Sequence, residues 1–201
     1  MQKLVFILCG LPGSGKSTWR ERFVTEFDST EKPYTVSTDD VVEEWAKQLN
    51  QTYAETWLQM REQLEPMLMA QMCEAMKHDK VVVDSTNLTA TKRNRIMDIL
   101  GPDCKYFVVD FTGVGMPTIL QRNKERAARG RSLPLEVLHS MDMLMEQPSP
   151  TQDNIILLRQ GAVSEVIRAG GVVDPDTGKF RGGTSLLHSS YDNYKEVYIN
   201  D

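Results

Sequence analysis

The chain contains few cysteines and histidines and no long apolar run. The 201 residues include three cysteines (Cys9, Cys73 and Cys104) and three scattered histidines. An odd number of cysteines without a C-x-x-C pair argues against a disulfide framework and against a zinc site. No apolar stretch approaches the ~20 residues that span a bilayer, and no signal peptide precedes the first apolar segment. We therefore expect a cytoplasmic protein with reduced thiols and no membrane association.

Positive charge is not in excess either. The chain has 23 Lys and Arg against 28 Asp and Glu, a net charge of −5. A protein that coats long nucleic acids through phosphate contacts has the opposite balance. The charge therefore excludes a large electrostatic footprint, but it is compatible with a local basic pocket that binds a few nucleotides.

Residues 4–27 contain the most informative motif. Leu4–Leu8 form an apolar run typical of a buried central strand, and Trp19, Phe23 and Phe27 recur at helical spacing. Between them lies a complete G-x-x-x-x-G-K-[ST] loop, which comprises Gly10, Leu11, Pro12, Gly13, Ser14, Gly15, Lys16, Ser17 and Thr18.

This loop predicts a nucleoside triphosphate site. Glycines let backbone N–H groups surround a polyphosphate without Cβ clashes, and the helix that follows directs its positive end at the same anion. Lys16 can reach the β- and γ-phosphates, and the Ser17 hydroxyl can hold Mg²⁺. We expect ATP or another nucleoside triphosphate, with Mg²⁺, as the cofactors.

Strand and helix patterns alternate along the chain. We predict strands at 4–8, 34–38, 81–83, 106–109 and 154–158, and helices at 39–50, 53–77, 89–100, 117–129 and from 134 to before Pro148, with the second helix kinked or split at Pro66. This order indicates an α/β fold, a mostly parallel sheet with helices on both faces. The carboxyl ends of such strands bind ligands, and the phosphate loop, Asp39 and Asp84 follow three of them.

The last part of the chain has a different composition. Residues 161–201 are rich in glycine, and Val172-Val173 and Lys179-Phe180 flank Asp174-Pro175-Asp176-Thr177-Gly178, which reads as a tight turn. We predict a first domain at 1–160 and a C-terminal extension at 161–201 that contains a small hairpin.

A row of arginines follows the fourth predicted strand. Arg122, Arg126 and Arg129 are spaced four and three residues apart, so one helix face presents three guanidinium groups. Such a face is either solvated or an arginine lid that covers the phosphates. We predict a lid in which Arg122 binds the nucleotide and either Arg126 or Arg129 stabilises the transferring group.

Acidic and polar residues at two strand ends complete the predicted site. Phosphoryl transfer needs a carboxylate near the attacking hydroxyl, and we assign this role to Asp39 rather than Asp40, since adjacent helical residues point in different directions. The alternative is that both only stabilise the helix start. We predict Asp84 near the Mg²⁺ water shell, and we assign Thr86 and Asn87 to the substrate site, where they would bond the substrate or neighbouring loops.

Four elements in order resemble phage-type polynucleotide 5′-kinase domains over residues 4–145: Gly10–Thr18, Ser-Thr-Asp-Asp at 37–40, Asp-Ser-Thr-Asn-Leu at 84–88, and Arg-Asn-x-x-Arg with a following Arg-Gly at 122–130. The resemblance implies a P-loop kinase fold in which Asp39 is the general base, Lys16 and Ser17 hold the donor phosphates and Mg²⁺, and a lid arginine stabilises the transferring phosphoryl group. The substrate-binding arginine of that family is Val42 here, and the phosphatase domain of some members is absent.

We therefore expect an ATP-dependent kinase acting on a hydroxyl of DNA or RNA, most simply the 5′-OH end. Lys92, Arg93 and Arg95 are candidate phosphate contacts or a solvated basic face, and Arg93 is assigned to the substrate site. Kinases of hydroxymethylpyrimidine bases in DNA or of small molecules such as nucleotides or nucleotide sugars would use the same machinery. The non-enzymatic alternative is a nucleotide-binding switch, which has no use for a base at Asp39.

Overall fold

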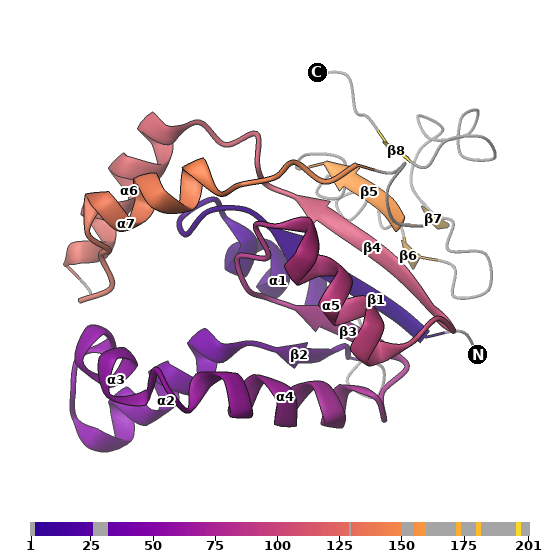
Figure 1. The fold of residues 1–201 in the computed structure, drawn as a ribbon, viewed down its shortest axis with the longest axis horizontal. Coiled ribbons are helices and arrows are strands. Elements are labelled where there is room, and N and C mark those ends of the chain that lie inside the picture. Colours follow the sequence, from indigo (N-terminus) through magenta and orange to yellow (C-terminus); the bar gives the residue numbers. More distant parts are fainter. Residues whose placement is uncertain are drawn as a thin grey trace.

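The computed structural model describes residues 3–25, 32–128 and 130–149, followed by the backbone of short strands between residues 155 and 197. A parallel sheet lies between helices, which confirms the predicted α/β fold (Figure 1). Phe27 and Arg129 lie outside the described residues. Within these ranges, no helix combines the length and the apolar character that a bilayer span requires.

The strands follow the predicted order with small shifts at their ends. The main sheet has the order β2-β3-β1-β4-β5-β8, and each neighbouring pair is parallel. Its members are β1 (Lys3–Cys9), β2 (Tyr34–Val36), β3 (Lys80–Val83), β4 (Cys104–Asp110), β5 (Ile155–Arg159) and β8 (Glu196–Val197). Strand β1 pairs with β3 and β4, and its residues 4–9 are buried, as a continuous apolar run requires.

The described helices are α1 (Lys16–Thr25), α2 (Thr38–Leu49), α3 (Tyr53–Met60), α4 (Leu64–Ala75), α5 (Ala90–Leu100), α6 (Met116–Ala127) and α7 (Leu135–Met143). The prediction for Pro66 was wrong in position: the break falls at residues 61–63, and Pro66 lies in the first turn of α4. Proline is tolerated there because the first N–H groups of a helix have no intrahelical partner.

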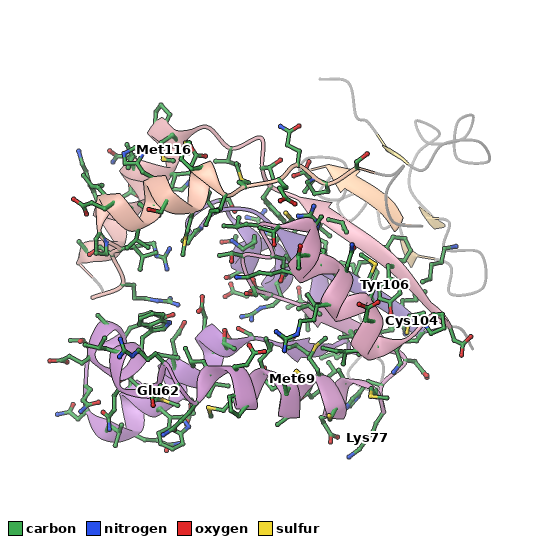
Figure 2. The ribbon with its side chains drawn as sticks, in the orientation of Figure 1. Glu62, Met69, Lys77, Cys104, Tyr106 and Met116 are labelled. Carbon is green, nitrogen blue, oxygen red and sulfur yellow. The ribbon has the colours of Figure 1, made fainter. Side chains whose placement is uncertain are left out.

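Alternate residues of β1 face opposite layers of helices. Val5 and Ile7 pack in one cluster with Met72 of α4 and Ile96 of α5. On the other face the Phe6 ring lies 4.7 Å from that of Phe23 in α1 and 4.8 Å from that of Phe107 in β4. In Figure 2, Tyr106 and Cys104 lie beside α5, where the Tyr106 hydroxyl donates to the Met97 and Gly101 carbonyls.

Two pairs of helices extend beyond the carboxyl edge of the sheet. In Figure 1, α6 and α7 lie above this edge and α2 and α3 lie below it. Because the strands are parallel, the segments that follow β1, β2 and β3 start at the same edge: the Asp84 amide donates to Val36, and the Gly10 amide donates to Thr86. The fold therefore brings together the three segments that the sequence analysis singled out.

The C-terminal strands add a pairing that we did not predict. Strand β8 pairs in parallel with β5 in the main sheet. Strands β6 (Val172–Val173) and β7 (Phe180–Arg181) pair antiparallel, as the two strands of the predicted hairpin would. The division of the chain at residue 160 stays a prediction.

Arg93 and Asn87 are buried structural residues, and their assignment to the substrate site was wrong. The Arg93 side chain is fully buried and donates to the carbonyls of Asn87, Leu88 and Glu146 at 3.0–3.2 Å. The Asn87 amide donates to the Leu8 carbonyl at 2.8 Å. Arg93 bonds the backbone of the loop after β3, and Asn87 joins this loop to β1, so the two side chains fix the loop against β1; neither lines the cavity described below.

The three cysteines are free. Cys9 and Cys104 are buried, and Cys73 on α4 is exposed. Burial raises the pKa of the Cys9 thiol to about 11, although the neighbouring Arg93 guanidinium lowers it.

We predict that Arg93→Met lowers the free energy of unfolding by about 2–4 kcal/mol, because it leaves buried carbonyl oxygens without donors. Arg95→Met is the matched control on the same helix: Arg95 is an exposed residue paired with Glu65 at 2.5 Å, and a surface pair contributes about 0–1 kcal/mol. Urea unfolding followed by circular dichroism measures both. Equal midpoints for the two variants would contradict the structural role of Arg93.

Candidate active site

A cavity of ≈ 590 Å³ lies at the carboxyl edge of the sheet. Its walls come from the phosphate loop, α1, α2, the loop after β3, and α6. The lining residues are Pro12, Gly13, Gly15, Lys16, Ser17, Thr18, Trp19, Arg22, Asp39, Asp84, Ser85, Thr86, Phe111, Arg122, Glu125, Arg126 and Arg131. Most of the predicted site residues therefore share one cavity, and each of the segments at this edge contributes to it.

The phosphate loop has its tightest contact at Gly10. A Cβ atom on Gly10 would lie 2.8 Å from the Phe111 Cβ and 3.0 Å from the Ser14 Oγ, so only glycine fits between the loop and the end of β4. Gly13 has φ +84°, a conformation that L side chains rarely adopt. Ser14 is fully buried, and its hydroxyl has no hydrogen-bond partner among the described residues.

Lys16 lies at the bottom of the cavity with its ammonium group directed at its own loop. The Lys16 Nζ donates to the carbonyl oxygens of Gly10 at 2.9 Å and Leu11 at 2.8 Å. Burial lowers the pKa of Lys16 to about 8, while Asp84 and Asp39 act to raise it. An anion in the cavity would oppose this effect of burial, because it stabilises the charged form.

The side chains of Asp39 and Asp40 have different surroundings. Asp40 accepts two hydrogen bonds from Arg20, at 2.7 and 3.1 Å, whereas Asp39 lines the cavity. The Ser37 hydroxyl accepts a hydrogen bond from the Asp40 amide and so caps the start of α2. Asp39 is thus the carboxylate of this pair that can reach a bound substrate.

Asp84 and Ser17 form the second polar group of the site. Both line the cavity, and Arg20 NH1 lies 3.2 Å from Asp84 Oδ2. Burial raises the pKa of Asp84, against the opposing charges of Arg20 and Lys16. Among the described residues, no three His, Cys, Asp or Glu side chains form a metal-ligand group. Mg²⁺ needs fewer protein ligands when phosphates and waters complete its shell, so Ser17 and Asp84 fit this ion.

The arginines of the predicted lid contact the site in different ways. Arg122 donates to the Gly13 carbonyl at 2.8 Å, which joins α6 to the phosphate loop. Arg126 lines the cavity, and burial followed by the charge of Arg131 lowers its pKa. Arg131 also lines the cavity and forms an ion pair with Glu43 of α2.

Sequence reasoning missed four residues around the site: Arg20, Arg22, Tyr53 and Arg131. Arg131 follows the predicted row of arginines in the sequence, but it lies beyond the end of α6 and shares no helical spacing with Arg122 and Arg126. Tyr53 follows Thr52, and Thr52 with Glu55 forms a capping box. That Thr-x-x-Glu pattern marks a helix start in the sequence, yet nothing in it indicates that Tyr53 lies beside Asp39.

The fold, the phosphate loop and the cavity together define a P-loop nucleotide-binding domain. A family model described as an AAA domain matches residues 5–148, and the chain belongs to this family.

Three solved structures are similar to the chain at low identity, and this similarity concerns the fold. Kti12 from Chaetomium thermophilum, in complex with ADP-AlF3, has a TM-score of 0.54 and 16% identity, covering 78% of this chain and 88% of its own. A gluconokinase from Sinorhizobium meliloti 1021 has a TM-score of 0.50 and 15% identity, and the match covers 81% of this chain and 87% of the gluconokinase. A kinase candidate from Chloroflexus aurantiacus has a TM-score of 0.56 and 15% identity, and the match covers 79% of this chain and 89% of that protein.

The lowered pKa of Lys16 predicts that nucleotide binding is coupled to proton uptake. Near pH 8.5 the free protein holds Lys16 largely deprotonated, since its pKa is about 8, and a bound triphosphate favours the protonated form. Binding heats in two buffers of different ionisation enthalpy should therefore differ at pH 8.5.

Lys16→Arg is the matched control, because arginine stays protonated throughout this range. Its binding heat should not depend on the buffer at pH 8.5. Buffer-independent heats for the unaltered protein at pH 8.5 would contradict the coupling.

Proposed function

We propose that the protein is an ATP-dependent kinase that transfers the γ-phosphoryl group to a hydroxyl of a nucleic acid, most simply the 5′-OH end of DNA or RNA. The observation that carries the proposal is the position of Asp39. Its carboxylate lines the same cavity as Lys16, Ser17 and Arg126, although it comes from a different strand end. A protein that only binds a nucleotide would not need a carboxylate at this place.

Each residue has a role that follows from its position. The phosphate loop and Lys16 hold the β- and γ-phosphates, and the nucleotide replaces the Gly10 and Leu11 carbonyls as acceptors of Lys16. The acceptor oxygen forms a bond to the γ-phosphorus, the bond from that phosphorus to the β–γ bridging oxygen breaks, and ADP leaves. Asp39 takes the hydroxyl proton.

Arg126 supplies positive charge to the transferring group. It lines the cavity, and its guanidinium makes no hydrogen bond or ion pair with another described residue. A free guanidinium can stabilise the charge that spreads over the equatorial oxygens. Arg122 is already bonded to the phosphate loop, so it positions α6 over the nucleotide. Mg²⁺, held by Ser17 and Asp84, would neutralise negative charge on the phosphates.

Two features support a nucleic-acid acceptor. The motifs in residues 4–145 resemble those of polynucleotide 5′-kinases. Among the described residues that line the cavity, five are cationic and three are acidic. An acceptor with phosphates of its own suits this excess, and the net charge of −5 restricts contact to a short segment.

We predict that Asp39→Asn lowers kcat by roughly 10²–10⁴-fold, because the asparagine amide cannot accept the proton. The dissociation constant for ATP should stay the same, since Asp39 contacts the acceptor hydroxyl. Transfer of labelled phosphate and fluorescence titration with a nucleotide analogue measure the two effects. Asp40→Asn is the matched control and should retain kcat within a few-fold; full activity of Asp39→Asn would remove Asp39 as the base.

We predict which acceptor is labelled when the protein is incubated with γ-labelled ATP. A single-stranded oligonucleotide with a 5′-OH end should be labelled, and the same oligonucleotide with a 5′-phosphate should not. DNA with internal hydroxymethyluracil, free nucleosides and gluconate are offered in parallel. Labelling of one of these alone would replace the proposed acceptor by a modified base or a small molecule.

A further inference from the structure

Tyr53, the first residue of α3, contacts the proposed base. Its hydroxyl lies 2.8 Å from Asp39 Oδ1 and donates a hydrogen bond to it. Burial and the Asp39 charge raise the pKa of Tyr53 well above its usual value, so Tyr53 keeps its proton and remains a donor. One carboxylate oxygen of Asp39 is thereby fixed, and Oδ2 accepts no hydrogen bond from the described residues.

The junction between α2 and α3 gives Tyr53 a defined position. Asn50 ends α2 in a left-handed conformation, and its amide bonds the carbonyls of the last turn. Thr52 and Glu55 then form a complete capping box at the start of α3. From this start of α3, the Tyr53 side chain reaches back to the first turn of α2, where its hydroxyl donates to Asp39.

The segment after α6 covers Tyr53 from the other side of the cavity. The Arg131 guanidinium lies 5.5 Å from the centroid of the Tyr53 ring and forms an ion pair with Glu43. Gly130 adopts φ +65°, and a Cβ atom there would lie 3.8 Å from the Thr52 Cβ. The end of the lid therefore rests on the α2–α3 junction.

We propose that Tyr53 is a positioning residue that orients the Asp39 carboxylate toward the acceptor hydroxyl, and that Arg131 holds Tyr53 in this position when the lid lies over the cavity. This inference rests on the proposed function, since it gives Asp39 an acceptor to face. The reaction requires an arginine lid over the phosphates and an oriented base. The contact between Arg131 and Tyr53 serves both, because it places the end of the lid and, through Tyr53, fixes the Asp39 carboxylate.

The first test is a double-mutant cycle. Tyr53→Phe keeps the ring beneath Arg131 and removes only the donor, so kcat should fall about 10-fold while the KM for ATP stays within twofold. Adding Tyr53→Phe to Asp39→Asn should cause no further loss. Tyr34→Phe, at the start of β2, is the control and should behave like the unaltered protein. Unchanged kcat for Tyr53→Phe, or losses that multiply in the double variant, would overturn the inference.

The second test measures the lid contact without turnover. Glu43→Gln weakens the ion pair with Arg131, so amide hydrogen exchange should become faster in residues 116–128 and 53–60. Glu44→Gln is the matched control, since Glu44 is exposed on the same helix and bonds only Gln48 among the described residues. Exchange as slow in Glu43→Gln as in the control would overturn the role of Arg131.

The two tests separate this inference from the proposed function. If the unaltered protein labels no acceptor while Glu43→Gln still speeds exchange, the kinase proposal fails and the contact between the lid and the α2–α3 junction stands. If the unaltered protein labels an acceptor and Tyr53→Phe does so equally well, the kinase proposal stands and the positioning role of Tyr53 fails.

Discussion

The concentration of positive charge around Lys16 is the constraint on which the site depends. Lys16 is buried, and Arg126 and Arg131 line the same cavity. Burial lowers the pKa of both Lys16 and Arg126, which means that the fold bears part of the free-energy cost of these charges before any ligand binds. A polyphosphate relieves this cost, so the arrangement favours binding of a multivalent anion over the empty state.

The parallel sheet makes this concentration possible, and buried polar side chains maintain it. Three strands end at one edge. Arg93 fixes the loop after β3 by bonding its backbone, and Asn87 joins this loop to β1 by bonding Leu8. On the opposite side of β1, the aromatic rings of Phe6, Phe23 and Phe107 anchor α1, whose first residue is Lys16. The residues that support the site are therefore largely distinct from those that line it.

The sequence predicted local features well and contacts between distant segments poorly. The glycine pattern predicted the phosphate loop, and strand order predicted that Asp39 and Asp84 would lie near it. Pairing of Arg131 with Glu43, and of Arg20 with Asp40, joins residues far apart in the chain, which no periodicity reveals. Arg93 is different: it shares a helix face with Ile96 and Leu100, both buried, so spacing alone could have identified it as a core residue.

The distribution of the cysteines has a practical consequence for spectroscopy. Nucleophilic attack on a maleimide or an iodoacetamide requires a thiolate that reagents can reach. Cys9 and Cys104 are buried, and the raised pKa of Cys9 keeps it as a thiol. Cys73 is exposed on α4 and takes no part in the cavity lining. The natural chain therefore carries one accessible attachment point for a fluorophore or spin label.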